Sequence, residues 1–175
     1  MDSVDLFDKG SAWAKQKIEG AKDSLDAPTP CGDWDVRTLI NHLISGLEYF
    51  QKRARGEEAP PPSAGDPPDV LDGGDPGAKY EAERKKTLEA FHGVDDKTLM
   101  ALGFAFVDQV VHGNDLAKAT GQDDTIPSDL AEAAFGMVTG NLTDENRGTA
   151  FGPAVDVSDD AGTQDKLLAY LGRSP

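Results

Sequence analysis

Apolar residues recur at helical spacing along most of this chain, with Gly, Pro and Asp between the helical segments. The clearest pattern follows Asp35, a residue suited to cap a helix, and continues through residues 36–56. Its apolar positions lie three or four residues apart: Val36, Leu39, Ile40, Leu43, Leu47 and Phe50. This spacing predicts a helix with one face in a hydrophobic core.

The same pattern predicts five further helices. They cover residues 3–25, behind a cap at Ser3, then residues 78–92, 96–120 and 128–141, and finally residues 163–172. Alternation typical of strands is almost absent, and residues 151–157 alone suggest a short extended piece. The fold class is therefore expected to be all-α.

Residues 57–77 interrupt the helical pattern and form the clearest linker of the chain. The segment holds six of the eleven prolines, together with glycines and acidic residues, so no regular element is expected there. Four substantial helices with one long crossover between the second and third predict a four-helix bundle, completed by small C-terminal helical additions. The length of 175 residues fits a single domain over residues 1–175.

The charge balance makes some partners improbable. The chain carries 32 acidic and 17 basic residues, a formal net charge of -15. Such a surface repels phosphate backbones and anionic lipid, so we expect neither nucleic acid nor a membrane as partner. High acidity by itself is most simply explained by solubility.

The cysteine content and the N-terminal residues predict the cellular compartment of the protein. Cys31 is the single cysteine, so an intrachain disulfide is excluded and a reducing cytoplasm is expected. The first residues lack the basic and apolar regions of a secretory signal, and no window approaches the ~18 apolar residues of a membrane span. Cys31 precedes the second helix in a turn and is interpreted as a packing residue.

Two ionisable residues interrupt the apolar run of residues 104–121. Asp108 and His112 are four residues apart and therefore share one helix face, which Asp115 continues. A carboxylate among apolar residues needs an ionic partner, and a divalent cation held by both side chains would supply it. The alternative is that Asp108 and His112 form an ion pair with each other.

A third metal donor must come from elsewhere in the chain. Of the other two histidines, His92 lies at a predicted helix C-terminus, where interaction with the helix dipole explains it. His42 lies beside the apolar face of the second helix. Taken alone it would be a core histidine, but beside the unexplained Asp108 and His112 it is the natural third donor.

Two stretches also resemble a known family. Residues 28–43, PTPCGDWDVRTLINHL, and residues 108–122, DQVVHGNDLAKATGQ, are similar to the DinB-like metal-binding superfamily. The similar branch is the short single-domain actinobacterial one, related to the N-terminal domain of mycothiol-dependent maleylpyruvate isomerase. The tail resembles the ending of short members, so the likeness covers essentially the whole chain.

The resemblance implies a four-helix bundle that holds one divalent metal. The family's ligands, carried onto this chain, are His42, Asp108 and His112, the set that the helical pattern also selects. Three protein ligands leave a coordination position open. Zinc is the first expectation for the ion, and nickel, iron and manganese are alternatives. The family's proposed chemistry uses a low-molecular-weight thiol, here mycothiol.

The chain also departs from the family pattern. Asn114 replaces the usual tryptophan after the His-Gly pair, which predicts a more polar or more open pocket wall. The large C-terminal domain of the maleylpyruvate isomerase is absent, so we do not expect that isomerase activity itself.

Three functions stay open. The first is a thiol-dependent transferase or isomerase in which the metal activates the thiol and Asp115 orients a ligand; no catalytic residue is assigned. The second is a non-catalytic metal- or ligand-binding module, with Trp34, Tyr49 and Phe106 as candidate pocket residues in either case. The third is a biosynthetic cyclase on the same fold. Expected partners are a small-molecule thiol or substrate and, as the commonest oligomer, a second copy in a homodimer.

Overall fold

The computed structural model describes residues 1–60, 62, 65–143, 145, 147 and 151–174. Its helices are α1 (Ser3–Ala21), α2 (Val36–Ala54), α3 (Pro76–Ala90), α4 (Asp96–Thr120), α5 (Ser128–Asn141) and α6 (Thr163–Tyr170). None of the described residues forms a β-strand, so the all-α prediction is confirmed. The chain divides into two compact units, residues 1–124 and 125–175. No helix in the described part of the chain has the length and apolar character that a membrane crossing requires.

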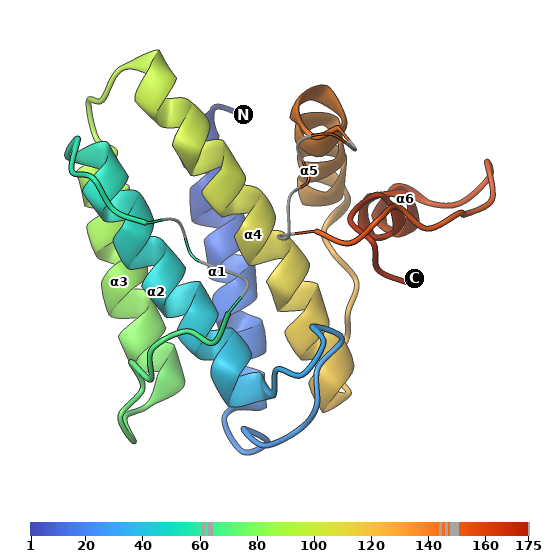
Figure 1. Cartoon of the computed structure of the whole chain (residues 1–175), viewed down its shortest axis with the longest axis horizontal. Helices are drawn as coiled ribbons and strands as arrows, with labels where there is room; N and C mark the ends of the chain where they lie inside the picture. Colours follow the sequence, from blue (N-terminus) through green and yellow to red (C-terminus); the bar gives the residue numbers. More distant parts are fainter. Residues whose placement is uncertain (61, 63–64, 144, 146, 148–150, 175) are drawn as a thin grey trace. The chain divides into compact units, whose positions relative to one another are not determined.

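The first unit is the predicted four-helix bundle. Helix α1 packs against α3 and α4, and α2 packs against the same two helices. The helices therefore follow each other around the bundle in the order α1, α3, α2, α4, and α2 and α4 run side by side (Figure 1). Any site between α2 and α4 thus lies between segments that are far apart in the sequence.

Aspartates cap the helices of the bundle. The Asp35 side chain accepts a hydrogen bond from the Thr38 backbone N–H, as expected, while Asp75 and Asp95 cap α3 and α4 in the same way. The predicted cap at Ser3 is wrong, because Ser3 is already helical and Asp2 accepts the bond from the Asp5 N–H.

Helix α1 also ends earlier than predicted, at Ala21 instead of residue 25. The carbonyls of Leu25 and Ala27 accept hydrogen bonds from the backbone N–H groups of Arg37 and Val36. These bonds take the segment out of the helix and tie it to the beginning of α2. A tertiary contact has therefore replaced the last turn of α1.

Two glycines allow α1 and α4 to approach closely. A Cβ atom at Gly10 of α1 would lie 2.7 Å from the Phe106 ring of α4, and one at Gly113 would lie 2.5 Å from the Trp13 ring of α1. Each helix thus offers a glycine to an aromatic ring of the other. This packing fixes the rotation of α4 and leaves Asp108 and His112 facing α2.

The crossover between α2 and α3 is anchored near its end. The Asn41 side-chain oxygen accepts hydrogen bonds from the backbone N–H groups of Val70 and Leu71, both at 3.0 Å, and its amide group donates to Asp69. Leu71 is buried. The linker predicted over residues 57–77 is observed up to Asp75, because Pro76 begins α3; residues 61 and 63–64 lie outside the described chain.

The second unit contains α5 and α6, which pack against each other. Arg147 places its guanidinium 4.6 Å from the centre of the Tyr170 ring, and the Tyr170 hydroxyl donates to the Leu142 carbonyl. In the predicted extended piece, the Val155 N–H donates to the Ala169 carbonyl. These contacts form the small helical addition expected at the C-terminus.

Candidate metal centre

The structure brings the three predicted ligands together between α2 and α4. One Asp108 carboxylate oxygen lies 3.4 Å from Nε2 of His42 and 3.4 Å from Nε2 of His112. The two imidazole rings meet edge to face, with their centres 5.0 Å apart. One donor atom from each residue lies within 4.8 Å of the other two. We call His42, Asp108 and His112 the histidine cluster.

The cluster is mostly shielded from water. The exposed fractions of the side chains are 11% for His42, 13% for His112 and 23% for Asp108. Burial alone would raise the pKa of Asp108, but the charges and hydrogen bonds of His112 and His42 outweigh it and hold that pKa well below its usual range. The carboxylate is therefore ionised and available as a ligand.

The same neighbours act on His112 in the opposite direction. Burial would lower its pKa, but the Asp108 charge and hydrogen bonds with Asp108, Asp115 and Cys31 raise the pKa well above the ordinary histidine value. These contacts favour the imidazolium form of the ring when no ion is bound. A metal ion bound at Nε2 would have to displace that proton.

The donor set fits a divalent ion. Donors about 2.0 Å from a tetrahedral ion lie about 3.3 Å apart, close to the two 3.4 Å contacts of Asp108. Charge-assisted hydrogen bonds are shorter, about 2.7–2.9 Å. The spacing thus leaves room for an ion, while both histidines also lie within ion-pair distance of Asp108, the alternative that the sequence leaves open.

The second nitrogen of His112 faces Asp115, which is 1% exposed. The distance from Nδ1 to the Asp115 carboxylate oxygen is 3.0 Å. A carboxylate at this position accepts a hydrogen bond from the Nδ1–H group, orients the ring and leaves Nε2 as the ligating atom. Asp115 is therefore placed where the sequence expects a residue that orients a ligand.

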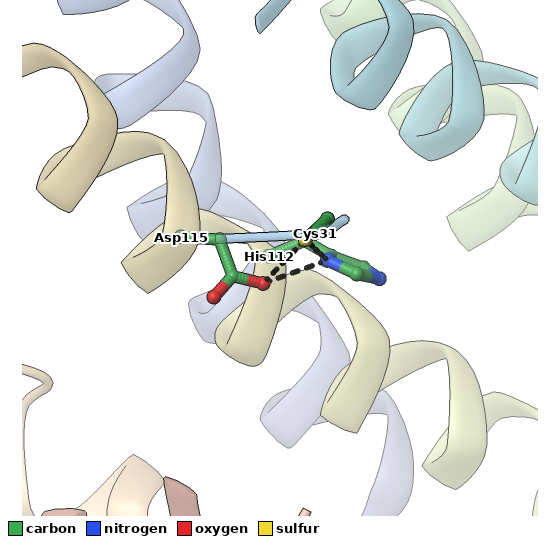
Figure 2. A group of neighbouring side chains, drawn as sticks. All are labelled: Cys31, His112 and Asp115. Carbon is green, nitrogen blue, oxygen red and sulfur yellow. Dashed lines mark hydrogen bonds and ion pairs between the residues drawn. The ribbon is translucent and has the colours of Figure 1, made fainter. Parts of the chain in front are cut away.

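Cys31 is more than a packing residue, so that interpretation was wrong. Figure 2 shows its sulfur meeting His112 and Asp115: Sγ lies 3.1 Å from the Asp115 oxygen and 3.6 Å from Nδ1 of His112. Cys31 lies 84 residues before Asp115. The helical spacing from His112 drew attention to Asp115, but no local signal connects Cys31 with it.

The predicted pocket residues divide into two groups. The Trp34 ring lies 5.0 Å from the His42 ring, and Tyr49 lines a cavity beside His42. Phe106 is completely buried and packs against Gly10, so its assignment to the pocket is wrong: the close α1–α4 contact takes its ring.

Asn114 and His92 lie outside the histidine cluster. Asn114 is buried and donates to the Asp124 carbonyl at 2.8 Å, so it holds the segment that follows α4. His92 comes just after the end of α3, is exposed, and belongs to neither group of metal donors among the described residues.

The cavity of about 270 Å³ lies along α2. Its walls include His42, Tyr49 and Lys52 from the helix, and Pro62 and Asp66 from the crossover. The cavity therefore connects one ligand of the histidine cluster to a space of mixed polarity.

The four-helix bundle agrees with the class of DinB-like helical proteins. Within that class, the chain belongs to the family described as the mycothiol maleylpyruvate isomerase N-terminal domain, which matches residues 18–117. The matched range contains all three residues of the histidine cluster, and the family resemblance noted in the sequence is confirmed.

Two curated relatives are uncharacterised proteins of Mycobacterium tuberculosis, from strains CDC 1551 / Oshkosh and H37Rv. Each is 26% identical over 166 residues, which cover 87% of this chain and 86% of the relative. No solved structure matches the chain.

Proposed function

We propose that the chain is a divalent-metal protein that works on a low-molecular-weight thiol of the mycothiol type, as a transferase or isomerase. One observation carries the proposal: three donors, two imidazoles and a carboxylate, converge beside a cavity. Three protein donors leave a tetrahedral ion with one open position, as in catalytic sites. Zinc is the expected ion, and nickel, iron or manganese suit the same donors.

In this proposal His42, Asp108 and His112 hold the ion. A divalent ion bound there would keep a thiol sulfur deprotonated, and a thiolate is a strong nucleophile at neutral pH. Asp115 holds the Nδ1 proton of His112 and so keeps Nε2 directed at Asp108. The Trp34 ring lies beside the His42 ring, with their centres 5.0 Å apart.

The cavity beside His42 is the proposed binding place for the small molecule. Its volume of about 270 Å³ is slightly below the common range of ligand pockets, about 300–1,000 Å³. It therefore encloses part of a small molecule and leaves the rest in solvent. Lys52 and the Tyr49 hydroxyl offer hydrogen bonds to a polar ligand.

Thiol binding to the zinc-loaded protein tests the proposal. Calorimetric titration with mycothiol is expected to show binding that is lost in His42→Ala and retained in His92→Ala. Mycothiol methylated at sulfur should bind much more weakly, because its sulfur cannot become a thiolate. Equal binding of the methylated compound would contradict the proposal and favour a non-catalytic ligand-binding module.

The proposal also includes the cellular location of the protein and its partners. We place the protein in the cytoplasm, where Cys31 stays reduced and small-molecule thiols are abundant. Its partners are small molecules, and a homodimer remains a prediction for size measurements in solution.

A further inference from the structure

A second group of metal donors lies on the far side of the His112 ring. Cys31, His112 and Asp115, which we call the thiolate cluster, meet through Sγ, Nδ1 and a carboxylate oxygen (Figure 2). The three separations are 3.1, 3.0 and 3.6 Å. The group combines a sulfur, a nitrogen and an oxygen donor around one point.

We propose that the thiolate cluster is a second metal site, selective for thiophilic ions, which shares His112 with the histidine cluster. At a tetrahedral zinc-sized ion, nitrogen and oxygen donors lie about 3.3 Å apart, and a thiolate lies about 3.5 Å from either. The observed separations depart from these values by about 0.4 Å or less. Small side-chain movements would therefore let an ion replace the shared protons.

The backbone already holds the sulfur in position. The Cys31 N–H donates to the Thr29 hydroxyl, which donates in turn to the Trp34 carbonyl, and the Trp34 N–H donates back to the Cys31 carbonyl. This turn is closed before any ion binds. Gly32 and Asp33, the next residues, are exposed, so the turn lies at the surface, where an ion can enter.

Burial of Asp115 supplies a reason for an ion to bind. Its side chain is 1% exposed, and a carboxylate withdrawn from water needs charge compensation. Without an ion, the protonated His112 ring pairs with it at 3.0 Å and the Cys31 thiol donates a hydrogen bond to it. A cation bonded to the same oxygen would take over the compensation that the ring proton supplies.

The proton balance makes the two sites alternatives. An ion at the thiolate cluster displaces the Cys31 S–H proton and the Nδ1 proton to solvent, while the remaining ring proton stays on Nε2, facing Asp108 at 3.4 Å. An ion at the histidine cluster needs the opposite arrangement, with Nε2 bare and Nδ1 protonated. As a neutral imidazole, His112 has one lone pair and serves one ion at a time; only an imidazolate could bridge two ions.

Donor chemistry decides which ion takes which site. Thiolate sulfur selects soft ions, whereas two imidazoles and a carboxylate accept manganese or nickel. Cadmium is therefore the probe for the thiolate cluster and manganese the probe for the histidine cluster. Zinc suits both donor sets.

The test titrates the metal-free protein with Cd²⁺ and follows the ultraviolet thiolate-to-cadmium charge-transfer band, for which Cys31 is the only source. We expect the band to saturate at one ion per chain. In Asp115→Asn the affinity should fall at least about tenfold, whereas in His42→Ala, which removes a donor of the histidine cluster and none of the thiolate cluster, it should stay within about twofold. Absence of the band, or equal affinity in Asp115→Asn, would overturn the proposal.

Electron paramagnetic resonance of bound Mn²⁺ tests the histidine cluster with the same kind of variants. Manganese binding should be lost in His42→Ala and retained in Cys31→Ser, and saturating Cd²⁺ should expel Mn²⁺ from the wild-type chain. Simultaneous full occupancy by both ions would overturn the claim that the two sites are alternatives. Failure of Mn²⁺ binding alone would count against the histidine cluster, while the cadmium band would still decide the second site. Circular dichroism confirms that each variant is folded.

Discussion

His112 divides its two ring nitrogens between different neighbours. Nε2 faces Asp108 at 3.4 Å, and Nδ1 faces Asp115 at 3.0 Å. Carboxylates on both sides favour an imidazolium when no ion is present, which is why the pKa of His112 is raised. Protonation and metal binding therefore compete for the same ring.

This competition predicts opposite effects of pH on stability and on metal affinity. A raised pKa makes the His112 contribution to folding fully present below about pH 6.5, the ordinary value, and lost as the pH rises through the folded-state pKa. Urea unfolding of the metal-free protein should therefore show declining stability from neutral to alkaline pH. Metal affinity should rise over the same range, because an ion must displace the imidazolium proton.

The control for the pH effect is His112→Gln, which cannot titrate. Its metal-free form should lack the His112-dependent part of the alkaline decline. An identical decline in the wild type and in this variant would show that other groups cause it.

The histidine cluster could be predicted from the sequence because its signal is local and its candidates are few. Asp108 and His112 share a helix face by spacing alone, and a chain with three histidines offers little choice for a third donor. Cys31 could not be assigned in this way. Its contact with Asp115 joins a surface turn to a distant helix, and no periodic pattern encodes the path of a turn.

At the scale of elements, the close contact of α1 and α4 positions the cluster. Replacing Gly113 by alanine would place a Cβ atom 2.5 Å from the Trp13 ring, and well-packed interiors resist such insertions. Gly113→Ala is expected to destabilise the protein by roughly 1–3 kcal/mol in urea unfolding. The matched control is Gly136→Ala on α5, where the added Cβ has no neighbour within 4 Å.

The two alanine variants should change the free energy of unfolding in opposite directions. Removing an exposed helical glycine such as Gly136 is expected to stabilise by roughly 0.5–1 kcal/mol, since alanine loses less backbone entropy on folding. If Gly113→Ala were as stable as the wild type, α1 and α4 would not approach as closely as described.

The anchoring of the crossover gives a second prediction at this scale. Asn41→Ala removes the acceptor of the Val70 and Leu71 N–H groups and should cost roughly 1–3 kcal/mol. Hydrogen exchange at both amides should become faster. Ser45→Ala is the control on the same helix, because among the described residues the Ser45 hydroxyl donates to the His42 carbonyl within α2. Unchanged exchange in Asn41→Ala would contradict the anchor.

Helix positions were largely predictable, and the packing of helices was not. The caps at Asp35 and the stop at Gly121 mark the ends of α2 and α4 from local chemistry. The order of helices around the bundle depends on glycine–aromatic contacts such as Gly10 with Phe106, which join distant positions. The sequence therefore suggested Phe106 as a pocket residue but could not show that its ring packs against Gly10.

At the scale of the whole molecule, the two compact units raise the question of cooperativity. The sequence predicts one domain over residues 1–175, and one domain should unfold in a single cooperative transition. Calorimetry and tryptophan fluorescence should then give the same midpoint, although both tryptophans, Trp13 and Trp34, lie in the first unit. Two separate transitions would contradict the single-domain prediction.

The central claim is that His42, Asp108 and His112 bind one divalent ion. Elemental analysis of untagged protein, purified without chelators, tests it most directly, with His42→Ala and His92→Ala beside the wild type. We predict close to one ion per chain in the wild type and in His92→Ala, and loss of most of it in His42→Ala. Wild-type protein that contains no metal and cannot be reloaded, or full metal content in His42→Ala, would contradict the account.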